Sequence, residues 1–278
     1  MTEILKYSSW KHKHHTVLSS FHDKTIVISY SGGKDSSVLL HFFQQASQDY
    51  DFSFEVHGVG FPCHVFTADE TRRLSGYWKE RGIDIVWHKN DGVDDLRLQQ
   101  LVDIGESPCV LCSEVKKSAL FSHFRKKGSD MSRIVIVLGY SLWDLVSASI
   151  ELTLRTKLGN SPDGCFHGKN SAERLEEISQ RFFPVLELQD GLTVFKPLIT
   201  YNDPDINGVI TRNAIPLGKE ECRYKGFRPK RLLSEYYGTF GLNFDYNKVH
   251  DFAKSVLDSP GIDYFQNIST LSYVEKMI

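Results

Sequence analysis

The chain has 278 residues, which is long enough for a core domain with a smaller appendage. Its formal net charge of −2 excludes a global attraction to nucleic acid, so any site for a polyanion must come from local clusters of basic residues. No apolar stretch is long enough to span a bilayer, and the first residues lack the apolar core of a secretory signal, which predicts a cytoplasmic protein. Thiols stay reduced there, so the five cysteines are candidates for metal binding or catalysis rather than for disulfides.

Strands and helices are expected to alternate along most of the chain. Residues 1–23 form a polar lead-in, and the run His12–His15 within it is expected to be a solvated tail. The β-branched residues 25–30 then predict a buried strand, and residues 36–48 carry apolar side chains at helical spacing. The same patterns predict further strands at 52–59, 83–88 and 133–138, and helices at 69–81, 112–127 and 142–154.

This alternation predicts an α/β fold, in which a parallel five-stranded sheet carries crossover helices on both faces. The fifth strand is expected at 192–197, where a proline marks the edge of the sheet. Residues 159–180 are predicted to be a polar insertion that precedes this strand. The expected organisation is a lead-in over 1–23, a core domain over 24–200 and a mostly helical appendage over 201–278.

A glycine-rich turn follows the first predicted strand and leads into a helix. Its sequence is Ser31-Gly32-Gly33-Lys34-Asp35-Ser36. Glycines let backbone amides point inward and the helix N-terminus adds positive potential, so the turn suits a phosphate group. The two serines offer hydroxyl donors, the lysine can neutralise a phosphate oxygen, and the aspartate can hold Mg²⁺. Open α/β sheets bind ligands at the carboxyl ends of their strands, so the turn predicts a nucleotide site.

The turn is not a Walker loop, which has four residues between its first glycine and its Gly-Lys pair. It resembles the PP-loop of the N-type ATP pyrophosphatases, Ser-Gly-Gly-x-Asp-Ser, and the alternative is a tight turn with a helix cap from Asp35 or Ser36. The resemblance implies an adenine nucleotide alpha hydrolase-like fold that binds ATP and Mg²⁺. It also implies that ATP adenylates an oxygen and releases pyrophosphate, after which a nucleophile displaces AMP.

Cys109 and Cys112 have C-x-x-C spacing just before a predicted helix, whose N-terminus favours thiolates. The pair alone fits a redox site, half a zinc site, half an iron–sulfur site or two buried cysteines. The longer run GESPCVLCSEVKKSALF resembles a segment of the tRNA 2-thiocytidine synthetases. Those enzymes also have a Gly-Phe-Pro stretch, as at 60–62, and a third cysteine after a Pro-Leu pair, as Cys222 follows 197–198. The resemblance covers roughly residues 24–230.

The resemblance implies a [4Fe–4S] cluster with Cys109, Cys112 and Cys222 as ligands, and one iron free to carry a sulfide that attacks the adenylated carbon. The implied activity is an ATP-dependent sulfurtransferase that thiolates a nucleobase in tRNA. The sulfur donor would be a cysteine desulfurase or sulfide, and related enzymes are often homodimers. Cys63 and Cys165 are interpreted as small half-buried residues, with a fourth ligand or a persulfide acceptor as the alternative.

One family motif is only partly preserved. The 2-thiocytidine enzymes usually have Gly-His-His-x-Asp-Asp after the fourth strand, whereas this chain has Gly-Tyr-Ser-Leu-Trp-Asp at 139–144. Gly139 and Asp144 remain as candidates for the ATP or Mg²⁺ site. Asp144 alternatively belongs to the first turn of a helix, where the dipole favours an acid. The lost histidines and aspartate leave the identity of the substrate open.

Two basic patches flank the predicted cluster ligands. The proposed substrate-binding residues are Lys116 and Lys117 in one patch, and Arg223, Arg228, Lys230 and Arg231 in the other. Tyr224 and Phe227 are interleaved in the second patch, and basic and aromatic groups together suit a flipped base and an RNA backbone. The alternative is an ordinary solvated helix face.

Three other functions fit parts of the sequence. The same activation chemistry would also serve a small molecule or a free nucleobase. Sulfonucleotide reductases and sulfate adenylyltransferases have similar loops, although the reductases usually carry a Cys-Cys…Cys-x-x-Cys set that this sequence does not contain. A non-enzymatic alternative is an iron–sulfur or nucleotide sensor that kept the loop and lost turnover.

Overall fold

The computed structural model describes residues 5–61, 67–89, 93–127, 130–158, 170–219, 222–227 and 229–277. Within these ranges no helix combines the length and the apolar character that crossing a membrane requires.

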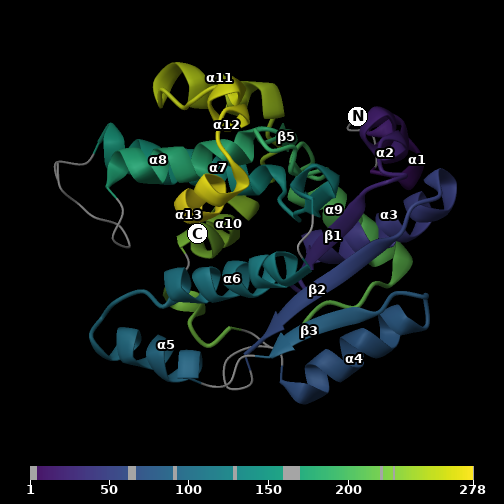
Figure 1. Cartoon of the computed structure of the whole chain (residues 1–278). Coiled ribbons are helices and arrows are strands. Elements are labelled where there is room, and N and C mark those ends of the chain that lie inside the picture. The colour runs from purple at the N-terminus through teal and green to yellow at the C-terminus, as the bar shows by residue number, and fades with distance from the viewer. Residues whose placement is uncertain are drawn as a thin grey trace.

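A single sheet lies at the centre of the described residues, with strand order β3-β2-β1-β4-β6-β5 (Figure 1). The strands are β1 (Thr25–Tyr30), β2 (Phe54–Gly60), β3 (Ile85–Lys89), β4 (Ile134–Val137), β5 (Val185–Glu187) and β6 (Thr193–Phe195). Every neighbouring pair is parallel except β5 and β6. The α/β prediction is therefore confirmed, and each expected strand is present.

The five predicted parallel strands are all present, and β5 adds a sixth, antiparallel strand that was not expected. Val185 pairs with Phe195 and Glu187 pairs with Thr193, so β5 extends the sheet beyond β6. Only the middle residue of β5 is fully buried. A strand of three residues is too short for its alternation to be recognised in the sequence, and this explains the miss.

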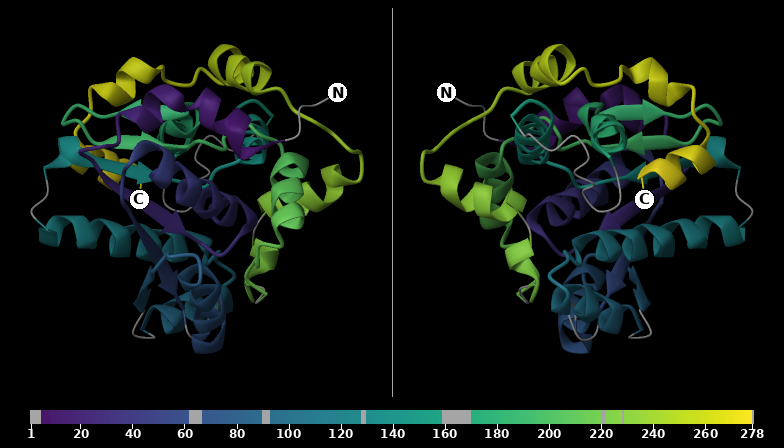
Figure 2. Two further views of the ribbon diagram at one scale, coloured as in Figure 1. Left: turned by 90° about the vertical axis from the view of Figure 1, so that its right-hand side faces the viewer. Right: turned by 90° about the vertical axis from the view of Figure 1, so that its left-hand side faces the viewer.

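Helices cover both faces of the sheet, as predicted. They are α1 (Tyr7–Lys13), α2 (His15–Ser19), α3 (Lys34–Tyr50), α4 (Ala68–Lys79), α5 (Val93–Asp103), α6 (Cys109–Lys127), α7 (Leu142–Thr156), α8 (Ser171–Ser179), α9 (Asp203–Asn213), α10 (Pro229–Gly238), α11 (Tyr246–Val256), α12 (Ile262–Gln266) and α13 (Thr270–Met277). Ile26 and Ile28 of β1 pack into a core with α1, α3 and α9, whereas Val27 faces a second core formed with α6, α12 and α13. Figure 2 shows the C-terminal helices arching over one end of the molecule.

The N-terminal lead-in is part of the core. Trp10 and Leu18 are completely buried, and His14 is 6% exposed. The ring Nε2 of His14 lies 3.0 Å from the carbonyl oxygen of Pro197. The expectation of a solvated run over His12–His15 is therefore wrong for His14. It follows Trp10 by four positions, so helical spacing places both side chains on the face that meets the sheet.

Two helices were not expected. α5 begins in a run that looked polar, and α8 occupies the end of the predicted insertion, whose residues 159–169 lie outside the described part of the chain. The start of α8 carries a capping box, in which the Asn170 side chain accepts from the amide of Glu173, and the Glu173 carboxylate accepts from the amide of Asn170. This Asn-x-x-Glu signal was available in the sequence.

Candidate active site at the carboxyl edge of the sheet

The loop after β1 is held against the first turn of α3. Gly32 has φ +65°, in the left-handed region that favours glycine, and Gly33 is the N-cap of α3. The Ser36 hydroxyl accepts a hydrogen bond from the Ser31 amide at 3.2 Å and donates to the Gly33 carbonyl at 3.1 Å. The loop therefore leads directly into a helix N-terminus, which is a favourable place for a phosphate group.

Lys34 bridges two carboxylates at this edge. Its Nζ lies 2.8 Å from Oδ1 of Asp35 and 3.1 Å from Oδ1 of Asp203. Burial lowers the pKa of Lys34, but the negative charges of Asp35 and Asp203 outweigh it and raise the pKa above its usual range. The lysine therefore stays charged, and two acids stand beside it that could share a divalent cation.

Asp203 is a site residue that the sequence reasoning missed. It is the first residue of α9, far from the loop along the chain. The neighbouring Asn202 and Asp205 form a capping box for this helix, which leaves the Asp203 carboxylate directed at Lys34. A helix start rich in acids was visible in the sequence, but its approach to the loop depends on the packing of α9 on α3.

Gly139 lies against the loop, as its place in the predicted site required. A Cβ atom at this position would come within 3.0 Å of the Ser36 amide nitrogen and 3.2 Å of the Asp35 carbonyl carbon. Real Cβ atoms rarely approach so closely, so a glycine is needed where the β4–α7 connection passes over the start of α3.

Asp144 caps α7. Its Oδ2 accepts a hydrogen bond from the Ser141 amide at 2.9 Å, while the Ser141 hydroxyl donates to Oδ1 of Asp203 at 3.0 Å. Ser141 thus links Asp144 to Asp203, and through it to Lys34. The helix-cap reading of Asp144 matches this geometry, while its role toward ATP or Mg²⁺ stays a prediction.

The two cysteine segments come together although they are far apart in the sequence. Cys112 is buried and packs in one cluster with Phe61, Tyr224 and the half-buried Cys222. Cys109 begins α6, and its sulfur lies 3.7 Å from the carbonyl oxygen of Phe227. Cys63 and Cys165 lie outside the described residues.

The thiol set suits an iron–sulfur cluster in its chemistry. Two of the soft sulfur donors, Cys112 and Cys222, belong to one apolar cluster, and Cys109 contacts Phe227 of that cluster from a helix N-terminus, where a thiolate is favoured. Within the part of the chain that the structure describes, no three His, Cys, Asp or Glu side chains converge as ligands of one metal ion. A cluster attaches each thiolate to a different iron, so its ligands stand farther apart than those of a single ion.

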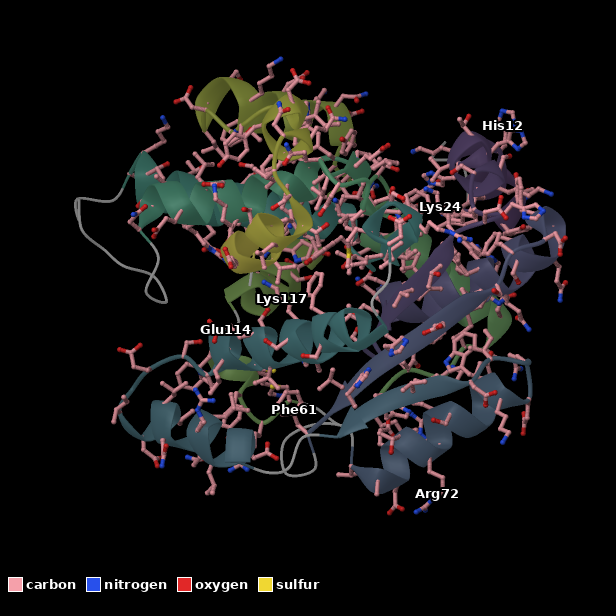
Figure 3. All side chains as sticks on the ribbon, viewed as in Figure 1. His12, Lys24, Phe61, Arg72, Glu114 and Lys117 are labelled. Carbon is pink, nitrogen blue, oxygen red and sulfur yellow. The ribbon has the colours of Figure 1, made fainter. Side chains whose placement is uncertain are left out.

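The basic residues that the structure describes differ in their surroundings. The ammonium of Lys116 lies 5.5 Å from the ring centre of Phe61, beside the cysteine cluster. Lys117 points from α6 toward the opposite layer of helices (Figure 3). Arg223 donates to the Gln99 side chain at 3.0 Å and lies over the Tyr224 ring. Arg228 is outside the described residues, and the side chains of Lys230 and Arg231 are not described, although both residues belong to α10.

A pocket of about 300 Å³ opens next to Asp203. It lies between α7, α9 and α10, and three aromatic residues, Trp143, Tyr237 and Phe244, contribute to its walls. The sequence reasoning did not anticipate this pocket, because its aromatic residues come from separate segments that only the fold brings together.

Comparison with known proteins gives two kinds of similarity. No family model matches the chain. A tRNA-cytidine(32) 2-sulfurtransferase of Anaeromyxobacter dehalogenans is 29% identical over 128 residues, which are 44% of this chain and 39% of that protein. The protein of the same name from Photorhabdus laumondii is 24% identical over 215 residues, 73% of this chain and 58% of its own length. The chain therefore spans less than two thirds of these relatives.

The fold has a solved counterpart. The U34-tRNA thiolase NcsA of Methanococcus maripaludis, solved with its [4Fe–4S] cluster, superposes with a TM-score of 0.62 at 12% identity, covering 91% of this chain and 82% of that one. Such a likeness supports the fold, and the sequence matches supply the relationship. With its Ser31–Ser36 loop in a strand–loop–helix setting, the chain is thus similar in sequence to the tRNA-cytidine(32) 2-sulfurtransferases and shares its fold with a tRNA thiolase.

Proposed function

We propose that the protein is an ATP-dependent, [4Fe–4S]-dependent sulfurtransferase that replaces a carbonyl oxygen of a nucleobase in tRNA with sulfur. One observation carries the proposal: the segment that leads to Cys222 is hydrogen-bonded to the nucleotide loop. The Gly218 amide donates to the Gly32 carbonyl at 2.8 Å, and Cys222 follows four residues later. This contact supports a site in which the activating loop and the thiol set act together.

The loop performs the activation. Its amides and Lys34 would hold the phosphates of ATP. When ATP binds, Lys34 would pair with a phosphate oxygen in place of one of its two carboxylate partners. Asp35 and Asp203 would then be available for Mg²⁺, which accompanies the nucleotide. The base oxygen attacks the α-phosphorus, pyrophosphate leaves, and the fixed positive charges stabilise the negative charge that develops on it.

Cys109, Cys112 and Cys222 would hold the cluster. When bound, a cluster with three protein thiolates supplies an iron with an open position, which can carry the incoming sulfur atom. The apolar side chains of Phe61 and Leu98 beside these cysteines limit access of water, so the adenylated base is protected from hydrolysis. Lys116 and Arg223 lie close enough to this region to meet backbone phosphates of the RNA.

A second candidate is the same chemistry on a small heteroaromatic molecule. The pocket of about 300 Å³ beside Asp203 favours it, because aromatic walls suit a planar ring. The changed motif at 139–144 also distinguishes the chain from the usual 2-thiocytidine pattern. Relatives with tRNA in their names favour the RNA substrate, so the small molecule remains second.

Anaerobic purification tests the cluster. We expect a brown protein with about four iron atoms per chain. Cys222→Ala should lose most of this iron, whereas Cys165→Ala, outside the resemblance's ligand set, should keep it. A colourless protein that still thiolates RNA would contradict the cluster, and pyrophosphate release that does not depend on added tRNA would favour the small-molecule substrate.

A further inference from the structure

A completely buried lysine lies one residue beyond β6. Lys196 has an exposed fraction of 0%, and its ammonium nitrogen has no hydrogen-bond partner among the described residues. An unpaired buried amine destabilises the fold, so such a residue is rarely kept for stability. Burial, aided by the positive charge of Arg181, lowers the pKa of Lys196 to about 7.

The position of Lys196 places it near the proposed site. Phe195 pairs with Val137, and the amide of Leu138 donates to the carbonyl of Phe195, so Lys196 lies at the carboxyl edge of the sheet next to the start of the β4–α7 connection. Val194 faces the core that includes α6 residues. Side chains alternate along a strand, so Lys196 belongs to this α6-facing side, the side that also carries the cysteines.

Arg181 supplies a second cation with an unfilled donor. Its Nε is buried and has no hydrogen-bond partner among the described residues, and its guanidinium lies 5.5 Å from the ring centre of Tyr140. Tyr140 directly follows Gly139, which packs against the loop. The Arg181 guanidinium therefore lies beside Tyr140, and the preceding residue, Gly139, packs on the nucleotide loop.

The negative charge near this pair is shared among several cations. The Glu177 carboxylate lies 2.8 Å from Arg174 but 3.4 Å from Arg181. Burial raises the pKa of Glu177, yet the positive charges of Arg174, Arg181 and Lys117 outweigh this effect and lower it. Arg181 is therefore only partly neutralised, and an anion would find uncompensated positive charge here.

We propose that Lys196 and Arg181 form a phosphate-binding subsite at the carboxyl edge of the sheet, on its α6-facing side. The phosphate belongs either to the nucleotide or to the RNA backbone. The Arg181 side chain is 20% exposed, and the Lys196 amide donates to the carbonyl of Pro184, three residues after Arg181, so the two cations belong to adjoining segments of which one reaches solvent. The assignment rests on the proposed function only in that its substrates carry phosphate groups.

The test compares Lys196→Met and Arg181→Gln with Lys24→Met in the full chain. Lys24 offers a matched control, because its ammonium is bonded to the Ser132 carbonyl at the opposite edge of the sheet (Figure 3). Lys196→Met should raise the melting temperature of the ligand-free protein, since it removes an unpaired buried amine. Lys24→Met should not raise it.

Binding of inorganic pyrophosphate and of a tRNA transcript then identifies the source of the phosphate. A nucleotide phosphate predicts about tenfold weaker pyrophosphate binding in both variants, with tRNA binding unchanged. An RNA phosphate predicts weaker tRNA binding and a salt dependence reduced by about one unit of slope, with pyrophosphate binding unchanged. Unchanged binding of both, or a destabilised Lys196→Met protein, would overturn the subsite. These measurements need no sulfur transfer. If the protein holds no iron but the two variants still lose pyrophosphate binding, the proposed sulfurtransferase function is contradicted and the subsite is not.

Discussion

At the scale of single residues, the site is organised by charges that neutralise one another until a ligand arrives. Lys34 holds Asp35 and Asp203 together, and Ser141 connects Asp203 with Asp144. Lys34 and Asp35 could be identified from the sequence, because they belong to one contiguous motif. Asp203 could not, since its role depends on a contact between segments that are distant along the chain.

Asp203→Asn should weaken the use of Mg²⁺. The amide keeps a hydrogen-bond acceptor for Ser141 but loses the charge that a divalent cation needs. The Mg²⁺ concentration for half-maximal pyrophosphate release should rise about tenfold or more. Asp205→Asn is the control in the same helix: its carboxylate accepts from the Asn202 amide, so the change should cost about 1 kcal/mol of unfolding free energy and leave the Mg²⁺ response intact. Equal effects of both variants would remove the case for Asp203 as a metal ligand.

His14 should make the fold sensitive to acid. Burial and the positive charge of Lys13 lower the pKa of His14 to about 4, although the hydrogen bond to the Pro197 carbonyl acts in the opposite direction. The unfolded chain therefore takes up this proton first, and stability is lost as the pH falls from about 6.5 to about 4, by about 3 kcal/mol in total. Denaturant unfolding at several pH values should show a weaker acid loss in His14→Phe than in the wild type. His12→Phe, at an exposed position of α1, the helix whose C-cap is His14, should show the wild-type loss.

At the scale of secondary structure, long periodic segments were predictable and short ones were not. The strand at 25–30, the loop and the helix that follows appear as expected, because the hydrophobic pattern, the glycines and the helix start agree. β5 has three residues, and α5 starts within charged sequence, so neither shows a clear period. The junctions between elements carry the chemistry, and their geometry depends on close backbone contacts.

Gly139→Ala should disturb the loop through such a contact. The new methyl group would press on the backbone of Asp35 and Ser36, which cannot retreat without moving the start of α3. We expect a loss of about 1–3 kcal/mol in unfolding free energy together with weaker ATP binding. Gly76→Ala is the matched control, because Gly76 lies on an exposed part of α4 with no atom near its Cβ position. It should stabilise the protein by about 0.5–1 kcal/mol and leave ATP binding unchanged; unaltered ATP binding in Gly139→Ala would mean that the loop tolerates the contact.

At the scale of the whole molecule, residues from both halves of the chain contribute to the candidate site. The loop and the C-x-x-C pair come from the first half of the chain, whereas Asp203, Gly218 and Cys222 come from the second. Cys222 was predicted as a cluster ligand only from the resemblance to the tRNA 2-thiocytidine synthetases. The sequence could not predict what fixes the segment before Cys222, because that support comes from side chains of α4.

The Glu70–Arg73 pair of α4 should control the order of this segment. Arg73 donates to Glu70 and to the Leu217 carbonyl at 2.7 Å, while the Glu70 carboxylate accepts from the Lys219 amide at 2.6 Å. Arg73→Met removes the bond to Leu217 and leaves Glu70 without its arginine partner, which should cost about 1.5–3 kcal/mol locally.

Because protease cleavage follows local opening, cutting within residues 215–222 should become at least about tenfold faster in Arg73→Met. Iron retention should fall in parallel if Cys222 is a ligand. Arg72→Met is the control: Arg72 is the preceding residue of the same helix, its side chain is 77% exposed, and it pairs only with Asp69 among the described contacts (Figure 3). If Arg73→Met is cleaved faster but keeps its iron, the order of residues 215–222 is not needed for cluster binding. If both variants are cleaved at the same rate, α4 does not hold the segment before Cys222 in place.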